Sequence, residues 1–121
     1  MKIVVDTNFW LLPGRTRTDV LAELQQAGYT IVLLKPVHSE LEKLSLNNSK
    51  TAEAARIALQ LIKRKGLKTI PSSASYADTA IQLYCEQHKA AAATQDASLR
   101  RKLRRLGIPV VTANRSGTIR H

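Results

Sequence analysis

The chain lacks several features that mark common classes of protein. Cys85 is its only cysteine, so no internal disulfide can form, which fits a protein of the reducing cytoplasm. Every apolar run is much shorter than the roughly 18 residues of a membrane span, and Met1 leads directly into an expected strand. We therefore expect no membrane segment, no signal peptide and a cytoplasmic location. Aromatic residues make up only 4% of the chain, so aliphatic side chains must supply the core.

Acidic residues are scarce as well. The 121 residues include 19 Lys and Arg but only 9 Asp and Glu, which gives a formal net charge of +10. Such an excess favours nucleic acid as the partner, and the lack of a membrane span ranks a membrane surface lower. A chain of this length is expected to form a single domain, residues 1–121, with a core of its own.

Apolar runs and helix-like periods alternate along the chain. The expected strands are residues 2–5, 30–34, 67–70, 90–94 and 108–112. The expected helices are residues 19–27, 36–46, 51–65, 76–87 and 97–106. This alternation predicts an α/β domain with a mainly parallel, five-stranded sheet covered by helices on both faces. A loop is expected at Pro13-Gly14, Thr18 is the expected N-cap of the first helix, and the tail from about residue 113 is expected to be irregular.

Four of the few acids are expected at one edge of this sheet. Asp6 follows the apolar run Ile3–Val5 directly, and Asp96 follows the fourth expected strand. The C-terminal ends of parallel strands are where α/β sheets bind ligands. Glu40 and Asp78 fall by helical phase at inward or edge positions of their helices, where an isolated charge is unfavourable without a cation or a partner.

These four carboxylates together indicate a metal site. Oxygen ligands, without a pair of histidines or cysteines at ligand spacing, select Mg²⁺ or Mn²⁺ over zinc. Taken singly, each acid has an ordinary explanation: a turn for Asp6, a solvated helix position for Glu40, and stabilisation of a helix start for Asp78 and Asp96. Their convergence on strand ends and inward helix positions is what favours the metal site.

The densest run of positive charge falls in the last expected helix. Leu99, Leu103 and Leu106 are spaced to form its buried face. The run consists of Arg100, Arg101, Lys102, Arg104 and Arg105, and a second basic cluster consists of Lys63, Arg64 and Lys65. An average charge run is only a solvated face. Here the excess of the same sign along the chain favours phosphate binding, which weakens as salt rises.

The order and spacing of five segments resemble the PIN-domain ribonucleases. The segments are Val4–Asn8, Pro36–Leu41, Tyr76–Asp78, Ala93–Asp96 and Leu99–Val110. Together they extend over essentially the whole chain, and the likeness is greatest to small archaeal single-domain PIN proteins. These include VapC-like toxins and relatives of nucleases that process precursor ribosomal RNA.

The resemblance implies a three-layer α/β/α PIN fold and a metal-dependent endoribonuclease that hydrolyses RNA phosphodiester bonds with one or two Mg²⁺ or Mn²⁺ ions. The acids at catalytic and metal-binding positions would be Asp6, Glu40, Asp78 and Asp96, with Thr7, Asn8 and Thr94 in support. The two basic clusters would bind the RNA. Ser98 stands where relatives often carry a further acid, so the number of ions stays open.

The implied partners are RNA (rRNA, tRNA or mRNA) and either a ribosomal precursor or an antitoxin protein, and a homodimer fits the resemblance. The cellular role, as a toxin or in RNA processing and turnover, stays open.

The main alternative is a catalytically inactive PIN module that binds RNA as a scaffold, which Ser98 favours. A receiver-like domain lacks support because no acidic pair stands beside the first strand, and no helix-turn-helix pair indicates a DNA-binding module.

Overall fold

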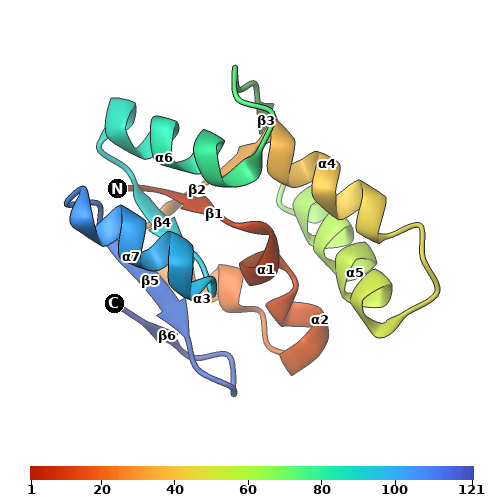
Figure 1. Cartoon of the computed structure of the whole chain (residues 1–121). Coiled ribbons are helices and arrows are strands. Elements are labelled where there is room, and N and C mark those ends of the chain that lie inside the picture. The colour runs from red at the N-terminus through yellow and green to blue at the C-terminus, as the bar shows by residue number, and fades with distance from the viewer.

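Six strands form one sheet in the computed structural model, which describes residues 1–121 (Figure 1). The strands are β1 Lys2–Val5, β2 Thr30–Leu34, β3 Thr69–Ile70, β4 Ala91–Ala93, β5 Val110–Ala113 and β6 Ile119–Arg120. Their order is β3-β2-β1-β4-β5-β6, and every neighbouring pair is parallel except β5 and β6. The predicted α/β fold with a mainly parallel sheet is confirmed, with one strand more than expected.

Helices cover both faces of this sheet. They are α1 Thr7–Trp10, α2 Leu12–Thr16, α3 Val20–Gln26, α4 Lys35–Leu44, α5 Lys50–Arg64, α6 Ala77–His88 and α7 Ala97–Arg105. Helix α3 leads from β1 to β2 and α6 leads from β3 back to β4, so right-handed crossovers place these two helices on opposite faces. Helix α6 packs against β1, β2 and β4, α7 against β5, and α3 against β2. No helix is both long and apolar enough to cross a membrane.

One cluster of 34 buried residues forms the core. Most of its members are aliphatic, and Phe9 and Trp10 of α1 are fully buried in it. Helix α1 starts directly after β1 and Asp6, and the Trp10 N–H donates a hydrogen bond to the Asp6 carbonyl oxygen at 3.1 Å. Burial of the two aromatic rings therefore anchors the first turn after β1, and with it the position of Asp6.

The expectation of a loop at Pro13-Gly14 is wrong, because both residues belong to α2. Proline is tolerated in the first turn of a helix, where its missing N–H has no partner to lose. Gly14 lets α2 approach α5 closely: a Cβ at this position would lie 2.6 Å from Ala54 Cα. Packing between two helices, which the local sequence does not encode, thus favours helix over loop here.

Helix α3 has a different N-cap from the expected one. The cap is Asp19, not Thr18, and Asp19 Oδ1 accepts a hydrogen bond from the Ala22 N–H at 3.0 Å. The Thr18 hydroxyl instead donates to the Thr16 carbonyl oxygen at 3.3 Å. Aspartate is well suited to the position because its negative charge also complements the N-terminal end of the helix dipole.

The C-terminal tail is regular, so the expectation of an irregular segment from about residue 113 is wrong. Strand β5 continues to Ala113, and β6 returns antiparallel beside it. The turn between them is closed by Asn114, whose Oδ1 accepts hydrogen bonds from the N–H groups of Ser116 and Thr118 at 3.1 and 2.9 Å. Gly117 supplies the positive φ of 85°. A turn stabilised by an asparagine side chain therefore reverses the chain. The residues around it show no alternating pattern from which a strand could be predicted.

Candidate active site

The site forms at the sheet edge where β1 and β4 end. Strand order reverses at this pair, because the chain moves outwards through β2 and β3 and then returns to β4. Open α/β sheets bind ligands in the crevice outside such a reversal. Asp6 directly follows β1 and Thr94 directly follows β4, and the Asp6 N–H donates to the Ala93 carbonyl oxygen at 2.9 Å. The structure thus places Thr94, which the resemblance gives only as a supporting residue, directly beside Asp6.

The Asp6 carboxylate is held at both oxygens. Asp6 is only 5% exposed, its Oδ1 accepts from the Thr7 N–H at 2.8 Å, and its Oδ2 accepts from the Thr94 hydroxyl at 2.9 Å. The Thr94 hydroxyl oxygen in turn accepts from the Asp96 N–H at 3.1 Å. Thr94 is fully buried, so this hydroxyl links the segment after β4 to the acid after β1. The result is a carboxylate with one fixed orientation.

Burial raises the pKa of Asp6 above its ordinary value of 3.8, and the hydrogen bonds from Thr94 and Thr7 oppose that rise. The charges of Asp78 and Glu40 raise this pKa further. A carboxylate in this setting is costly to ionise because it is poorly solvated and faces charge of its own sign. A bound cation would remove both costs.

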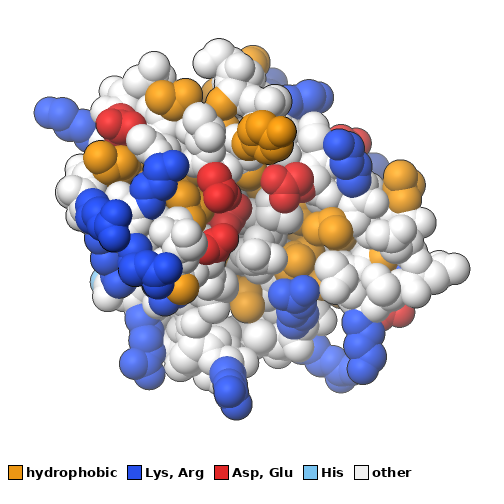
Figure 2. Space-filling view, viewed as in Figure 1, with side chains coloured by type: hydrophobic (Ala, Val, Ile, Leu, Met, Phe, Trp, Pro, Cys, Tyr) orange, Lys and Arg blue, Asp and Glu red, His pale blue; other side chains and the backbone are white.

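Glu40 and Asp78 lie at the rim of the site. Both are exposed, Glu40 on α4 and Asp78 in the first turn of α6. The negative charge of each raises the pKa of Asp6. Figure 2 shows acidic side chains gathered near the middle of one face, with Lys and Arg on either side. No three acidic, histidine or cysteine side chains lie close enough to enclose a metal ion as a set. The acids therefore form a cluster of negative charge around Asp6 rather than a preformed set of metal ligands.

Asp96 has a clear structural role. It is the N-cap of α7, and its Oδ1 accepts from the N–H groups of Ser98 and Leu99 at 2.8 and 3.1 Å. Its Oδ2 makes no hydrogen bond within the protein. Ser98 is exposed beside it. A contribution of Asp96 to metal binding would therefore come from Oδ2, because Oδ1 is already occupied by the helix.

The oxygen atoms around Asp6 suit a hard divalent cation. Thr7 is 5% exposed, and its hydroxyl has no hydrogen-bond partner although it is buried beside Asp6. A buried hydroxyl without a hydrogen-bond partner is unfavourable, so the Thr7 hydroxyl is suited to bind a water molecule or an ion. Asn8 follows on α1 and is exposed. Carboxylate, hydroxyl and amide oxygens are the ligands that Mg²⁺ and Mn²⁺ prefer, so these residues fit such an ion.

The basic helix starts at the acid cluster. Asp96 caps α7, and the helix carries Arg100, Arg101, Lys102, Arg104 and Arg105, of which all but Arg100 are exposed. Leu99 and Leu103 are buried as predicted, whereas Leu106 is 47% exposed because the helix ends before it. The positive face of α7 therefore extends outwards from the acids.

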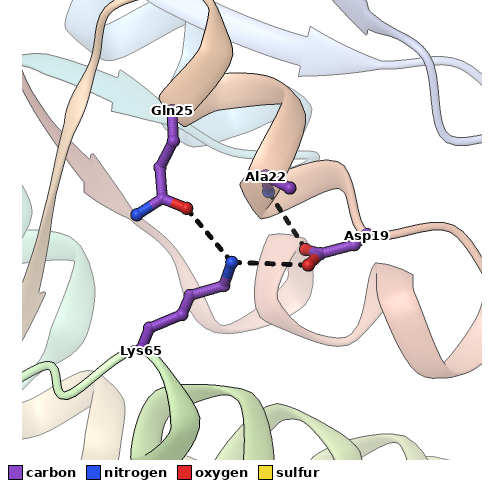
Figure 3. A network of polar contacts seen from close by, with 4 residues as sticks. All are labelled: Asp19, Ala22, Gln25 and Lys65. Atoms are coloured by element: carbon purple, nitrogen blue, oxygen red, sulfur yellow. Dashed lines mark hydrogen bonds and ion pairs between the residues drawn. The ribbon is translucent and has the colours of Figure 1, made fainter.

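The second basic cluster lies elsewhere. Lys63 and Arg64 are exposed at the end of α5. Because α5 leads into β3, it ends near the N-terminal ends of the parallel strands, whereas the acids lie at their C-terminal ends. Lys65 Nζ forms an ion pair with Asp19 Oδ2 at 3.3 Å and donates to Gln25 Oε1 at 3.1 Å (Figure 3). The structure does not bring these three residues to the acids. Lys65 ties α5 to α3, and RNA contact by Lys63 and Arg64 stays a prediction.

Tyr76 is a candidate binding residue to which sequence reasoning assigned no role. Its side chain is 79% exposed, and it is the N-cap residue of α6, two residues before Asp78. The neighbouring groove, about 250 Å³ in volume, includes Glu40 and Ser75 in its lining. An aromatic residue beside a predicted acid, in a chain with so few aromatics, is the signal that could have identified it. An exposed ring at this position offers a surface on which a base can stack.

Comparison with known proteins gives the family. The chain belongs to the PIN-like domain family, because the family model described as "PIN like domain" matches residues 3–115. The resemblance identified in the sequence is confirmed.

Two curated relatives are named as ribonucleases. Ribonuclease VapC4 of Methanocaldococcus jannaschii is 35% identical over 115 residues, which cover 91% of this chain and 88% of the relative. Ribonuclease VapC9 of Archaeoglobus fulgidus is 32% identical over 109 residues, which cover 88% and 78%. A solved structure described as a domain of a functionally unknown protein from M. jannaschii aligns with a TM-score of 0.59 at 20% identity, over 93% of this chain and 91% of that one. At that identity it shows the fold alone.

Proposed function

We propose that this protein is an endoribonuclease that hydrolyses RNA phosphodiester bonds with Mg²⁺ or Mn²⁺ bound at Asp6. The observation that carries the proposal is the buried Asp6 carboxylate, fixed by hydrogen bonds and facing the charges of Glu40 and Asp78. A buried carboxylate among other acids is unfavourable unless a cation binds there. The names of the two relatives support RNA as the substrate.

Each residue of the site has a distinct part. Asp6 would hold the ion, with Glu40, Asp78 and Oδ2 of Asp96 closing round it. The bound ion would lower the pKa of an attacking water and neutralise charge on the phosphate. Thr94 and the backbone N–H after Asp6 hold the carboxylate in one orientation. Because that orientation exists before substrate arrives, little organisation remains for the reaction to complete.

The charge around the site supports a strand of RNA as the substrate. The basic face of α7 starts beside Asp96 and would neutralise backbone phosphates, which gives affinity without base specificity. Of the two cellular roles considered, the VapC names of both relatives favour the toxin-like one, with an antitoxin protein as partner.

Metal dependence is the decisive test of this function. Purified protein should cleave single-stranded RNA in Mn²⁺ or Mg²⁺ and lose that activity in EDTA. Mn²⁺ should also raise the melting temperature without RNA, because a ligand at a hundredfold excess over its Kd stabilises the native state by about 2.7 kcal/mol. Stabilisation by Mn²⁺ and RNA binding without cleavage would favour the inactive scaffold instead. Cleavage that persists in EDTA would contradict the proposal.

Tyr76 should contribute to RNA affinity through stacking. Its side chain makes no capping hydrogen bond, so Tyr76→Ala is expected to leave the fold intact. Loss of one stacked base costs about 1–3 kcal/mol, or about 5- to 150-fold in affinity. Fluorescence anisotropy with labelled RNA in EDTA measures this without cleavage. Tyr76→Phe, which keeps the ring, is the matched control and should bind RNA like the parent. If Tyr76→Ala binds RNA as tightly as the parent does, Tyr76 does not contact the RNA.

A further inference from the structure

A charged pocket lies between α2 and the start of α5. It has a volume of about 350 Å³ and is lined by Gly14, Arg15, Arg17, Lys50 and Glu53. No apolar side chain lines it, so it is unsuited to a base, an acyl chain or the apolar face of a protein helix. The charged and polar lining is suited to bind a small, hydrated anionic group.

Close helix packing builds this pocket. The absence of a side chain at Gly14 brings the α2 backbone against α5, since a Cβ there would lie 2.6 Å from Ala54 Cα. The residues after Gly14 on α2 therefore stand opposite the first turn of α5. Arg15 and Arg17 come from one side of the pocket and Lys50 from the other.

The three cations of the pocket are unpaired. Neither ion pair of the protein includes any of them, although Glu53 lines the same pocket. The only hydrogen bond among their side-chain nitrogens is a long one, from Arg15 Nη2 to Thr51 Oγ1 at 3.5 Å. Arg17 has a φ of 58°, a left-handed conformation that glycine adopts with less strain. The pocket therefore carries three cations against the single carboxylate of Glu53, and none of the three is held in an ion pair.

The pocket and the basic face of α7 stand on either side of the acids. Helix α2 follows α1, whose N-cap is Asp6, whereas the N-cap of α7 is Asp96. Figure 2, viewed as in Figure 1, shows Lys and Arg over α7 on one side of the central acids and over α2 and the start of α5 on the other. One polyanionic strand lying across the acids would meet positive charge in both directions.

We propose that the α2–α5 pocket binds a backbone phosphate of the RNA strand whose other flank lies on α7. The inference rests on the proposed RNA substrate and adds a second anchor to it, so that the strand is held on both sides of the bond to be cleaved. Arginine suits this role because its planar guanidinium donates two parallel hydrogen bonds to a phosphate. Holding both flanks positions the intervening phosphodiester over Asp6, which binding on one flank alone does not do.

The test compares a pocket variant with a control of equal charge. Arg17→Gly with Lys50→Gln removes two pocket cations, and glycine suits the positive φ at residue 17, so the melting temperature should not fall. The control, Lys2→Gln with Lys68→Gln, also removes two exposed charges. These lie at the starts of β1 and β3, at the opposite ends of the strands from the acids. Affinities are measured by anisotropy in EDTA, with single-stranded uridine oligomers of increasing length and over a range of salt concentrations.

With the parent, affinity should step upwards at the length where a strand reaches both α7 and the pocket. The pocket variant should lack that step and bind long oligomers about tenfold more weakly. Its salt slope should be shallower by about 0.7 for each phosphate that the pocket no longer neutralises. The control should keep the step. Short oligomers should bind the pocket variant and the parent equally.

Two outcomes would overturn the proposal. One is a pocket variant that matches the parent in affinity and salt slope at every length, which would show that the pocket binds no phosphate of the strand. The other is an equal loss of affinity in the control, which would mean that net charge alone governs binding. These affinities are measured without metal, so a failure of the proposed nuclease function, seen as absence of cleavage by the parent in Mn²⁺, is a separate result.

Discussion

Replacing Asp6 with asparagine should abolish RNA cleavage while making the metal-free protein more stable at neutral pH. Loss of a residue that merely supports a metal ligand typically costs 10- to 100-fold in activity, so loss of the central ligand should exceed about a hundredfold. Asparagine has the same shape, and its amide oxygen can accept the hydrogen bond from the Thr7 N–H. Its amide N–H can donate to the Thr94 hydroxyl oxygen, so this one hydrogen bond reverses its direction. The native fold should therefore persist.

The gain in stability follows from the sign of the pKa shift. Burial and the charges of Asp78 and Glu40 raise the pKa of Asp6 in the folded state. The folded protein then holds this proton more tightly than the unfolded chain does. The free energy of unfolding therefore falls as pH rises from about the ordinary value of 3.8 towards and past the folded pKa. Asp6→Asn lacks this titration and escapes that loss.

Urea unfolding in EDTA at acidic and neutral pH measures the effect. The stability of the parent should fall more between the two conditions than that of Asp6→Asn. Mn²⁺ should then stabilise the parent and not the variant, which reverses their order. Glu86→Gln, an exposed acid at the far end of α6 from Asp78, is the control and should retain cleavage. An Asp6→Asn variant that still cleaves RNA at the parental rate would remove the proposed metal site.

Gly14→Ala should destabilise the protein, although helix propensity alone predicts the opposite. Alanine is favoured over glycine in a helix by about 1 kcal/mol. Its Cβ would, however, lie 2.6 Å from Ala54 Cα and 2.9 Å from Ala54 Cβ, closer than atoms in contact normally approach. Overpacking of this kind costs about 1–3 kcal/mol. Since backbone atoms of α5 cannot move aside easily, we expect the overpacking cost to exceed the helix-propensity gain, with a net loss of up to about 2 kcal/mol.

Urea unfolding decides the sign of this change. The double variant with Ala54→Gly separates the two contacts, because it removes Ala54 Cβ and leaves Ala54 Cα in place. It should recover little stability if the backbone contact dominates. A more stable Gly14→Ala protein would mean that α2 and α5 do not pack this closely in solution, and the pocket between them would then have no basis.

The parts of the fold that could be predicted are those with a long local signal. Strands β1 and β2 match the predicted residues 2–5 and 30–34, because a continuous apolar run bounded by polar residues is typical of a buried strand. Helical phase placed Glu40 and Asp78 at inward or edge positions. The structure leaves both exposed at the rim of the site, from where their charges raise the pKa of Asp6. Parallel strands end at the same side of the sheet, which is why Asp6 and Asp96 could be expected near each other without coordinates.

The parts that could not be predicted depend on contacts between distant segments. Helices α1 and α2 are too short to show a period, and the second forms against α5, from which it is far away in the sequence. Strand β6 has only two residues, which pair with β5 through a turn built by the Asn114 side chain. The charged pocket depends on the contact between Gly14 and Ala54. Such contacts leave no trace in local composition or spacing.

The two outermost strands of the sheet, β3 and β6, are each only two residues long. A long unpaired edge is a template on which a second chain can add its own strand, and very short edge strands prevent this. The sheet therefore offers neither side for growth into a continuous intermolecular sheet. A homodimer of this protein would therefore be expected to pack through other surfaces, such as those of its helices, rather than by pairing of edge strands.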